Sequence, residues 1–551
     1  MTAPFLIRVL PNVSGYQHRD LCYRTFVLVF TFFCYTSYHL SRKPISVVKS
    51  VLYHKNCSDV AHGNSTNTSD PYWCDWPPFD KSDASSLLGT LDLCYLIAYA
   101  VAMFLSGHLA DRMNLRHYLS IGMIGSGIFT MAFGFGYFFN IHSFIFYACV
   151  QVVGGAFQAT GWPSVVACVG NWFGKGKRGL IMGIWNAHTS VGNILGSVIA
   201  GAFVDIAWGW SFVVPGIIIS FIGILVFFFM VPNPRDVDCA KPDHSDTLEQ
   251  DPQEQLDVDQ SSVQHKESET KVQIVSRCID TEADTEEERM VRAGETTALL
   301  PSRRHVPHKE KAISIWKAFM IPGVLEFSLC LFFAKLVSYT FLYWLPNYIS
   351  VSETSLSASQ SAYTSTMFDV GGIVGGILAG YISDRFRLRG LTCVIFLIAA
   401  APLLFVYQAY GSKVPYYANC LLLVVCGACV NGPYSLITTA VSADLGTHKS
   451  VRESAKALGM VTAIIDGTGS IGAALGPMLT GVISNSGWQN VFYMLIAADF
   501  VAALLLSRVV VKEIRQKIYG YEDDVTIIVP KNTVQGDVES PKPSISQSQQ
   551  K

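Results

Sequence analysis

The sequence is poor in charged residues, since Asp, Glu, Lys and Arg make up 15% of its 551 residues. Hydrophobic residues make up 50% of the chain, and the mean hydropathy is +0.33. This composition is too apolar for a soluble protein of this length and predicts a polytopic membrane protein. The net charge of −2 gives no reason to expect a nucleic-acid partner.

Several sequence motifs of enzymes are also absent. The chain has no GxxxxGK[ST] phosphate loop and no HExxH pair, so nothing predicts ATP hydrolysis or a catalytic metal. The stretch 467–472 has the spacing of a dinucleotide fingerprint, but it lies inside an apolar run and not between a strand and a helix. We therefore predict no enzyme, no cofactor and no metal site. Residues 1–20 lack the short apolar core and cleavage site of a removable signal peptide.

Twelve apolar runs are long enough to cross a bilayer, which takes about 20 residues as a helix. They come as six runs, a break and six more. The first six lie near 22–44, 86–107, 117–138, 143–168, 179–204 and 210–231. The second six lie near 319–345, 361–382, 391–410, 416–440, 457–483 and 488–510. The predicted fold class is an all-α membrane protein with twelve transmembrane helices in two six-helix bundles.

The break and the end of the chain differ in composition from the apolar runs. Both are rich in acidic and small polar residues, which predicts solvated, disordered segments. The predicted divisions are an N-terminal segment (1–20), a first bundle (21–232), a linker (233–312), a second bundle (313–511) and a tail (512–551).

Short basic loops predict the orientation in the membrane. Residues 111–116, 175–178 and 384–389 are basic and fall on one side if every run spans once. Because cytosolic loops carry the excess of Lys and Arg, we expect this side, both termini and the linker to be cytosolic. The loop 51–85 then lies on the lumenal face.

The loop 51–85 carries signals that agree with a lumenal position. Asn56, Asn64 and Asn67 each begin a glycosylation acceptor pattern. Cys57 and Cys74 are the two cysteines of this polar loop, and they can form a disulfide in an oxidising compartment.

A polar hairpin recurs in the two halves, as 107–112 after the second run and as 380–385 after the eighth. Recurrence at the same place indicates two related bundles. The charged members of the two hairpins are predicted to latch neighbouring helix ends, with a generic basic turn as the alternative. These members are Asp111, Arg112, Asp384 and Arg385. Glycines four residues apart predict close helix packing at Gly192/Gly196, Gly372/Gly376/Gly380 and Gly472/Gly476.

The stretch 35–44, which ends the first run, places Arg42 and Lys43 side by side. A charged side chain at the bilayer centre costs about 2.5–3.5 kcal/mol on insertion scales, so a cation there is expected to meet an anion. The planar fork of arginine suits two phosphate oxygens. The alternative is snorkelling, because Arg42 lies about 28 Å along a helix that begins at Tyr23.

Two six-helix halves with this hairpin resemble the major facilitator superfamily. The first half carries 38–43, 161–163, 171–172, 177–179 and 185–192, and these motifs resemble the organophosphate:phosphate antiporters. With its lumenal loop and acidic linker, the chain is most similar to the vertebrate sugar phosphate exchangers of solute carrier family 37. The resemblance implies exchange of glucose-6-phosphate for inorganic phosphate in the endoplasmic reticulum membrane, with glycerol-3-phosphate as the alternative substrate.

The family also implies a phosphate held by one arginine on helix one and one on helix seven. Arg42 matches the first position, whereas Ser338 occupies the second. Lys335, one turn earlier, is the predicted substitute; the alternative is a structural pair of this lysine with Asp369 or Asp466. Further departures are Thr189 at the position of the family histidine, with His188 before it, and Met103 at the position of a helix-two lysine.

The remaining candidates for substrate contact offer charge, hydroxyl or amide groups on the presumed cavity helices. They are Lys43, Tyr35, Tyr38, Tyr99, His188, Asn431, Tyr434 and Asp466. The expected partners are the sugar phosphate, inorganic phosphate and membrane lipid. A membrane sensor that binds sugar phosphate and signals through the linker or tail is the alternative from another functional class. Glu295, Leu299 and Leu300 match an acidic dileucine signal, which makes an endolysosomal location the alternative.

Overall fold

The computed structural model describes residues 16–52, 76–110, 112–173, 184–239, 315–353, 356–446 and 457–519. Within these ranges the regular structure is helical. Helices are found in all the predicted runs where the structure describes them: the run 143–168 is divided between two helices, and the start of the run 179–204 lies outside the described residues. Nine helical segments of the described ranges are long and apolar enough to cross a membrane, and one shorter apolar helix spans His188–Val204. The chain is an all-α membrane protein, as predicted.

The helices of the two halves follow in chain order. The first half contains α2 (Tyr16–Arg42), α3 (Pro44–Leu52), α5 (Ala84–Ala110), α6 (Leu115–Phe138), α7 (Phe144–Gln158), α8 (Gly161–Trp172), α10 (His188–Val204), α11 (Trp208–Phe229) and η2 (Pro234–Val237). The second half contains α14 (Ile315–Phe319), α15 (Val324–Ser352), α16 (Ala358–Phe386), α17 (Arg389–Tyr410), η3 (Gly411–Lys413), α18 (Tyr416–Leu436), η4 (Ile437–Val441), α19 (Ser442–Gly446), α20 (Ala457–Ile483), η6 (Ser484–Ser486), α21 (Trp488–Leu505) and α22 (Ser507–Tyr519).

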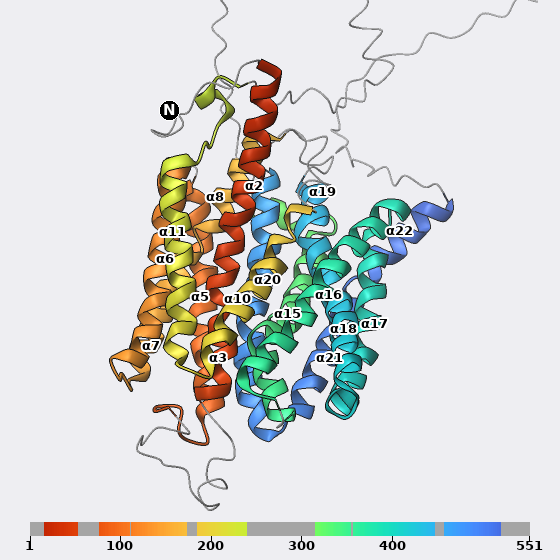
Figure 1. Cartoon of the computed structure of the whole chain (residues 1–551). Helices are drawn as coiled ribbons and strands as arrows, with labels where there is room; N and C mark the ends of the chain where they lie inside the picture. Colours follow the sequence, from red (N-terminus) through yellow and green to blue (C-terminus); the bar gives the residue numbers. More distant parts are fainter. Residues whose placement is uncertain are drawn as a thin grey trace, which may run out of the picture.

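The two halves form two bundles that lie side by side, red to yellow and green to blue in Figure 1. We call the end at which α3 stops and α5 starts the loop end. The end at which α5 meets α6 and α16 meets α17 is the hairpin end. At the loop end, Ser359 Oγ of α16 donates to the carbonyl of Gly201 in α10, and Asn485 Nδ2 donates to Ser86 Oγ of α5 at 3.2 Å. The bundles are therefore joined at this end.

The first membrane helix is longer than its apolar run. The run ends near residue 44, but the chain bends after Arg42 and continues as α3 to Leu52. Pro44 is the first residue of α3, where its missing N–H and fixed φ are tolerated. The ten residues after Arg42 add about 15 Å of helix on the far side of this residue. Arg42 is 5% exposed, so its guanidinium does not snorkel to an aqueous end.

Glycines bring the helices into backbone contact, as predicted for most of the glycine pairs. A Cβ on Gly472 would lie 2.0 Å from the carbonyl oxygen of Phe332, and one on Gly196 would lie 2.7 Å from that of Leu40. Only hydrogen fits at such positions. The prediction was wrong for Gly380, because no atom lies within 4 Å of a Cβ built there.

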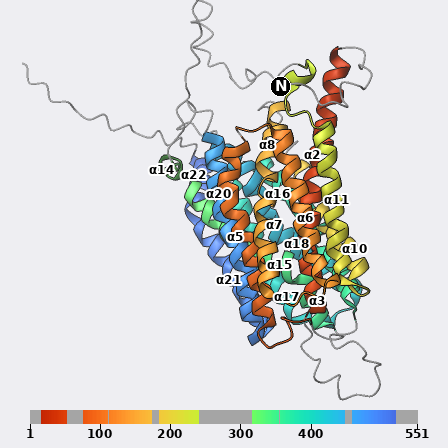
Figure 2. The ribbon, with the colours of Figure 1, turned by 90° about the vertical axis from the view of Figure 1, so that its left-hand side faces the viewer.

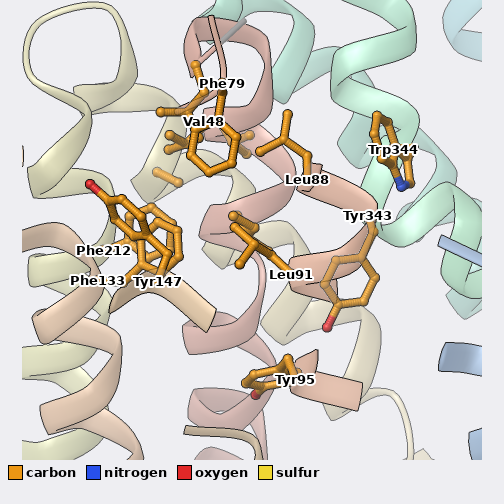
Figure 3. Packing of buried hydrophobic residues seen from close by; sticks show 14 of the residues in the cluster. Val48, Phe79, Leu88, Leu91, Tyr95, Phe133, Tyr147, Phe212, Tyr343 and Trp344 are labelled. Carbon is orange, nitrogen blue, oxygen red and sulfur yellow. The ribbon is translucent and has the colours of Figure 1, made fainter. Parts of the chain in front are cut away.

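A buried apolar cluster fills the loop end, and both bundles contribute to it (Figure 3). Val48, Leu88 and Leu91 of the first bundle pack there with Tyr343 and Trp344 of α15. This cluster fixes α15 against α3 and α5. It thereby sets the distance between the charged side chains described next.

Candidate functional site

Arg42 is buried among neutral groups. Its Nη2 donates to Gln158 Oε1 at 3.1 Å, and its guanidinium carbon lies 5.2 Å from the centre of the Tyr99 ring. Gln158 Nε2 donates in turn to the hydroxyls of Ser41 and Ser126, which fixes the amide with its oxygen toward Arg42. Among the described residues, no carboxylate forms an ion pair with Arg42. The guanidinium therefore keeps its full charge available.

A small cavity lies beside this guanidinium. Arg42, Tyr95 of α5 and Tyr343 of α15 all line it. Among the described residues, Arg42 Nε and the hydroxyl of Tyr343 are buried without a hydrogen-bond partner, and the hydroxyl of Tyr95 faces the Arg42 guanidinium. Buried polar groups are nearly always paired in proteins. A guanidinium and two hydroxyls on one small cavity make it a candidate site for a polar ligand with acceptor atoms.

Lys335 differs from Arg42 in having an acidic partner. Its Nζ donates to Asp466 Oδ1 at 2.7 Å and lies 5.6 Å from the centre of the Tyr434 ring. Of the two acids predicted as structural partners of Lys335, Asp466 is the one in contact. Tyr99, whose ring contacts Arg42, also lies within electrostatic reach of Lys335 and Asp466.

Lys43 connects the two bundles. Its Nζ donates to the carbonyl oxygen of Leu342 in α15 at 2.9 Å and lies 4.0 Å from Asp369 Oδ2 of α16. Asn193 of α10 donates to the other oxygen of Asp369 at 3.0 Å. The Asp369 carboxylate is thus held by two groups of the first bundle, and a lysine predicted to bind substrate contacts protein atoms here.

A third buried lysine, Lys49, was missed by the sequence reasoning. Lys49 and Asp92 form an ion pair in which both side chains are wholly buried. Lys49 Nζ also donates to the carbonyl of Tyr343 at 3.2 Å and lies 4.1 Å from the centre of the Trp344 ring. Two signals pointed to the pair: Lys49 is a cation seven residues after Arg42, and Asp92 is an acid inside the run 86–107.

Pro346 explains why these lysines contact backbone oxygens. A proline has no N–H, so the carbonyl four residues before it, that of Leu342, loses its helical donor. Lys43 supplies the missing donor, and Lys49 meets the next carbonyl, that of Tyr343. We call these two carbonyls, one turn before Pro346, the proline notch. The first bundle thus contacts α15 through the main-chain oxygen that the proline leaves without a helical donor and through the carbonyl next to it.

A larger cavity lies between the bundles. Ser338 Oγ donates to Asn431 Oδ1 at 2.6 Å on its wall, so the serine at the expected helix-seven cation position pairs with a predicted contact residue. The polar residues on its wall are His39, Asn186, Thr189, Ser190, Asn193, Ser338, Asp369, Asn431, Tyr434 and Ser435. Such a lining of hydroxyls and amides suits a polyhydroxylated ligand.

His188 is wholly buried and packs against the rings of Trp185 and Tyr35, with centroids 4.2 Å and 4.7 Å away. It does not line either cavity. His39, one turn before Arg42, does line the larger cavity, and sequence reasoning missed it. The two imidazole rings are stacked at 6.2 Å.

Tyr35 and Tyr38 lie inside the first bundle. The Tyr35 ring packs against Trp162 at 5.2 Å, and the Tyr38 hydroxyl pairs with Thr160 Oγ1 at 3.1 Å. Neither lines the two cavities described here. Of the predicted contacts, the structure brings Arg42 together with Tyr99, and Lys335 together with Asp466 and Tyr434.

The predicted latch residues are exposed where the structure describes them. Arg112, Asp384 and Arg385 face outward, and the ion pair recorded at the second hairpin joins Arg389 to Asp444 at 2.7 Å. Predicted features outside the described residues are Asp111, Asn56, Asn64, Asn67, Cys57, Cys74, Glu295, Leu299 and Leu300.

Comparison with known proteins agrees with the predicted resemblance. Residues 31–455 match the family model described as Major Facilitator Superfamily. The chain is 55% identical over 494 residues to the glucose-6-phosphate exchanger SLC37A2 of Bos taurus, covering 89% of this chain and 95% of the relative. It is 53% identical to the Homo sapiens protein of that name, covering 90% and 94%, and 50% identical to Homo sapiens SLC37A1, again covering 90% and 94%.

A solved structure supports the fold. The crystal structure of a bacterial homologue of the human lysosomal transporter Spinster, inward-facing and unoccupied, matches with a TM-score of 0.57 at 16% identity, covering 89% of this chain and 98% of that one. The chain belongs to the Major Facilitator Superfamily.

Proposed function

We propose that this multi-pass membrane protein exchanges a sugar phosphate, glucose-6-phosphate first among them, for inorganic phosphate. The names of its relatives support this substrate class. The observation that carries the proposal is Arg42, a buried cation with neutral partners beside a cavity with unpaired polar groups. A doubly charged phosphoryl group is the ligand that satisfies all of these groups together.

The two cavities suggest two parts of one ligand. The phosphoryl group binds at Arg42, with the hydroxyls of Tyr95 and Tyr343 as donors. The sugar ring extends into the larger cavity, because His39 on its wall lies one turn from Arg42 on α2. There, Asn431 and Tyr434 offer amide and hydroxyl groups to the sugar.

Exchange follows from the cost of an unpaired buried charge. In the empty carrier, closing both ends around the Arg42 guanidinium would bury a cation without an anion. A bound phosphate removes this penalty, so the loaded carrier reorients and the empty one resists. Lys335 becomes the second cation of the site when its Nζ leaves Asp466 and binds the phosphate. The direction of net transport then depends on the two gradients.

The loop end must open once in each cycle. In the structure it is closed by the proline notch, where Lys43 and Lys49 hold α15. Opening toward the loop end therefore requires these two lysines to leave the carbonyls of Leu342 and Tyr343. Lys49 keeps Asp92 as a partner within its own bundle, and Lys43 is left free for the substrate.

Counterflow in liposomes tests the function. Liposomes loaded with phosphate should take up labelled glucose-6-phosphate through the full chain, and Arg42→Ala should abolish this uptake. Lys413→Ala, a change at an exposed cation of the loop end, is the control and should leave uptake unchanged. Undiminished uptake by Arg42→Ala would overturn the assignment. Binding of sugar phosphate without any counterflow would favour a sensor instead.

The substrate and the location require separate measurements. Competition by a series of sugar phosphates against phosphate exchange should rank glucose-6-phosphate above glycerol-3-phosphate. We propose the endoplasmic reticulum membrane as the location. Imaging of the chain with Leu299 and Leu300 changed to Ala tests the dileucine signal, because a shift from endolysosomes to the reticulum would show that it is used.

A further inference from the structure

Helix α22 follows the last bundle helix and lies at the hairpin end (Figure 1). One of its faces holds the second hairpin, where α16 ends and α17 begins. Glu513 accepts hydrogen bonds from the backbone N–H groups of Gly390 and Leu391 at 2.8 Å and 3.1 Å. Lys517 Nζ donates to the carbonyl of Phe386 at 3.0 Å. This face of α22 therefore caps both helix ends of the hairpin.

The opposite face of α22 is exposed and mixes cations with apolar side chains. Arg508, Lys512 and Arg515 are exposed, and their spacing of four and three residues places them on one helical stripe. Val511 and Ile518, seven residues apart, are 48% and 67% exposed and form the apolar edge of this stripe. Exposed apolar side chains along such an edge are not expected on a helix face that contacts only water.

A second apolar group lies at the same end of the same bundle. Trp316 of α14 and Met320 just after it are 78% and 83% exposed, and Lys317 between them is exposed as well. Figure 2 shows α14 at the margin of the hairpin end. Arg508 lies 3.5 Å from Glu326 in the first turn of α15, which follows α14, so the two segments are tied to one another.

We propose that the exposed face of α22, with α14 beside it, binds the anionic phospholipid headgroups of the membrane surface. Val511, Ile518 and Trp316 enter the boundary between headgroups and acyl chains, as amphipathic interfacial helices do. Arg508, Lys512 and Arg515 meet the lipid phosphates. Because the other face of α22 caps the second hairpin, lipid binding holds that hairpin in place.

Hydrogen exchange in nanodiscs tests both parts without relying on transport. The full chain is placed in nanodiscs of phosphatidylcholine alone, or of phosphatidylcholine mixed with phosphatidylserine. The amides of Gly390 and Leu391 should exchange several-fold more slowly in the anionic discs. The triple variant Arg508→Gln, Lys512→Gln, Arg515→Gln should lose this difference, whereas Arg508→Lys, Lys512→Arg, Arg515→Lys should retain it.

Native mass spectrometry of the chain released from the mixed nanodiscs measures lipid binding directly. Each cation removed should weaken retention of phosphatidylserine on the order of fivefold. Equal retention by the triple glutamine variant and the parent would overturn the proposal. So would equal protection in neutral nanodiscs to which sodium sulfate is added, because the surface would then bind a free anion and not a lipid.

Discussion

Arg42 and Lys335 are the two cations predicted to clamp the substrate, one in each bundle, and the structure treats them differently. Arg42 is held by an amide oxygen and an aromatic ring, whereas Lys335 is held by the carboxylate of Asp466. The charge of Arg42 is open to an incoming anion, and that of Lys335 is neutralised until Asp466 is displaced. The comparison indicates an order of binding, in which the phosphoryl group meets Arg42 first and recruits Lys335 afterward.

The Lys49–Asp92 pair is the structural reference for this comparison, since both side chains are wholly buried and neither lines the two cavities. Lys49→Met should lower the free energy of unfolding by about 3–5 kcal/mol, because it leaves the Asp92 carboxylate buried without a partner. Apparent melting temperature in detergent measures this. The double change Lys49→Met, Asp92→Leu should recover most of the loss. A single variant as stable as the parent would contradict the buried pair.

Arg42→Lys separates charge from geometry at the open site. Lysine keeps the charge but lacks the planar fork that donates to two oxygens at once, so phosphate exchange should fall on the order of 100-fold. Lys335→Arg keeps charge and donors in the second bundle and should fall less than tenfold. Initial rates of phosphate counterflow measure both variants. A reversed order would show that the clamp depends mainly on the second bundle.

Lys335→Met tests whether the paired cation contributes through charge or through neutralising Asp466. The single change leaves the Asp466 carboxylate near the bound phosphate without its cation. The exchange rate of this variant should therefore be on the order of tenfold lower than that of the double variant Lys335→Met, Asp466→Leu. Counterflow at several phosphate concentrations gives the apparent affinity. If single and double variants match, Asp466 does not face the phosphate.

Pro346→Ala probes the contact between the bundles and should have the smallest effect. Alanine restores an N–H that can bond to the Leu342 carbonyl, so Lys43 faces a competing donor and the closed loop end becomes less populated. Chemical cross-linking between Ser86→Cys and Asn485→Cys, whose side chains touch at 3.2 Å, reports closure and should fall several-fold. Pro402→Ala, within α17, is the matched control. An unchanged yield would mean that the notch does not hold the gate.

The sequence allowed prediction of the helices and of the buried cations Arg42, Lys43 and Lys335, because these features depend on local composition. Apolar runs of membrane length appear whatever their neighbours are, and Arg42 stands out as a charge within one of them. The acidic partner of Lys335 could be narrowed to two residues, Asp369 and Asp466, but the sequence could not distinguish between them. The choice between Asp369 and Asp466 depends on how α15 packs against α16 and α20, which no local pattern encodes.

The features that were missed involve tertiary contacts or small angular offsets. Lys49 was overlooked because the first run appeared to end near residue 44, although the helix continues through the bend to Leu52. His188 was chosen as the candidate histidine, but His39 lines the larger cavity. Thr189, at the aligned position, lines the larger cavity, whereas the neighbouring His188 does not. Successive residues of an α-helix are rotated by about 100° around its axis, so they face different surroundings.

The proline notch has a consequence for how mutational scans of this protein should be interpreted. Its acceptors are main-chain oxygens, which every residue type at positions 342 and 343 supplies. Substitutions there would test only the packing of Leu342 and Tyr343 side chains and would leave the lysine acceptors in place. Transport would instead be sensitive to substitution of Pro346, although Pro346 forms no hydrogen bond with either lysine. The contact that closes this gate thus depends on the N–H hydrogen that Pro346 lacks.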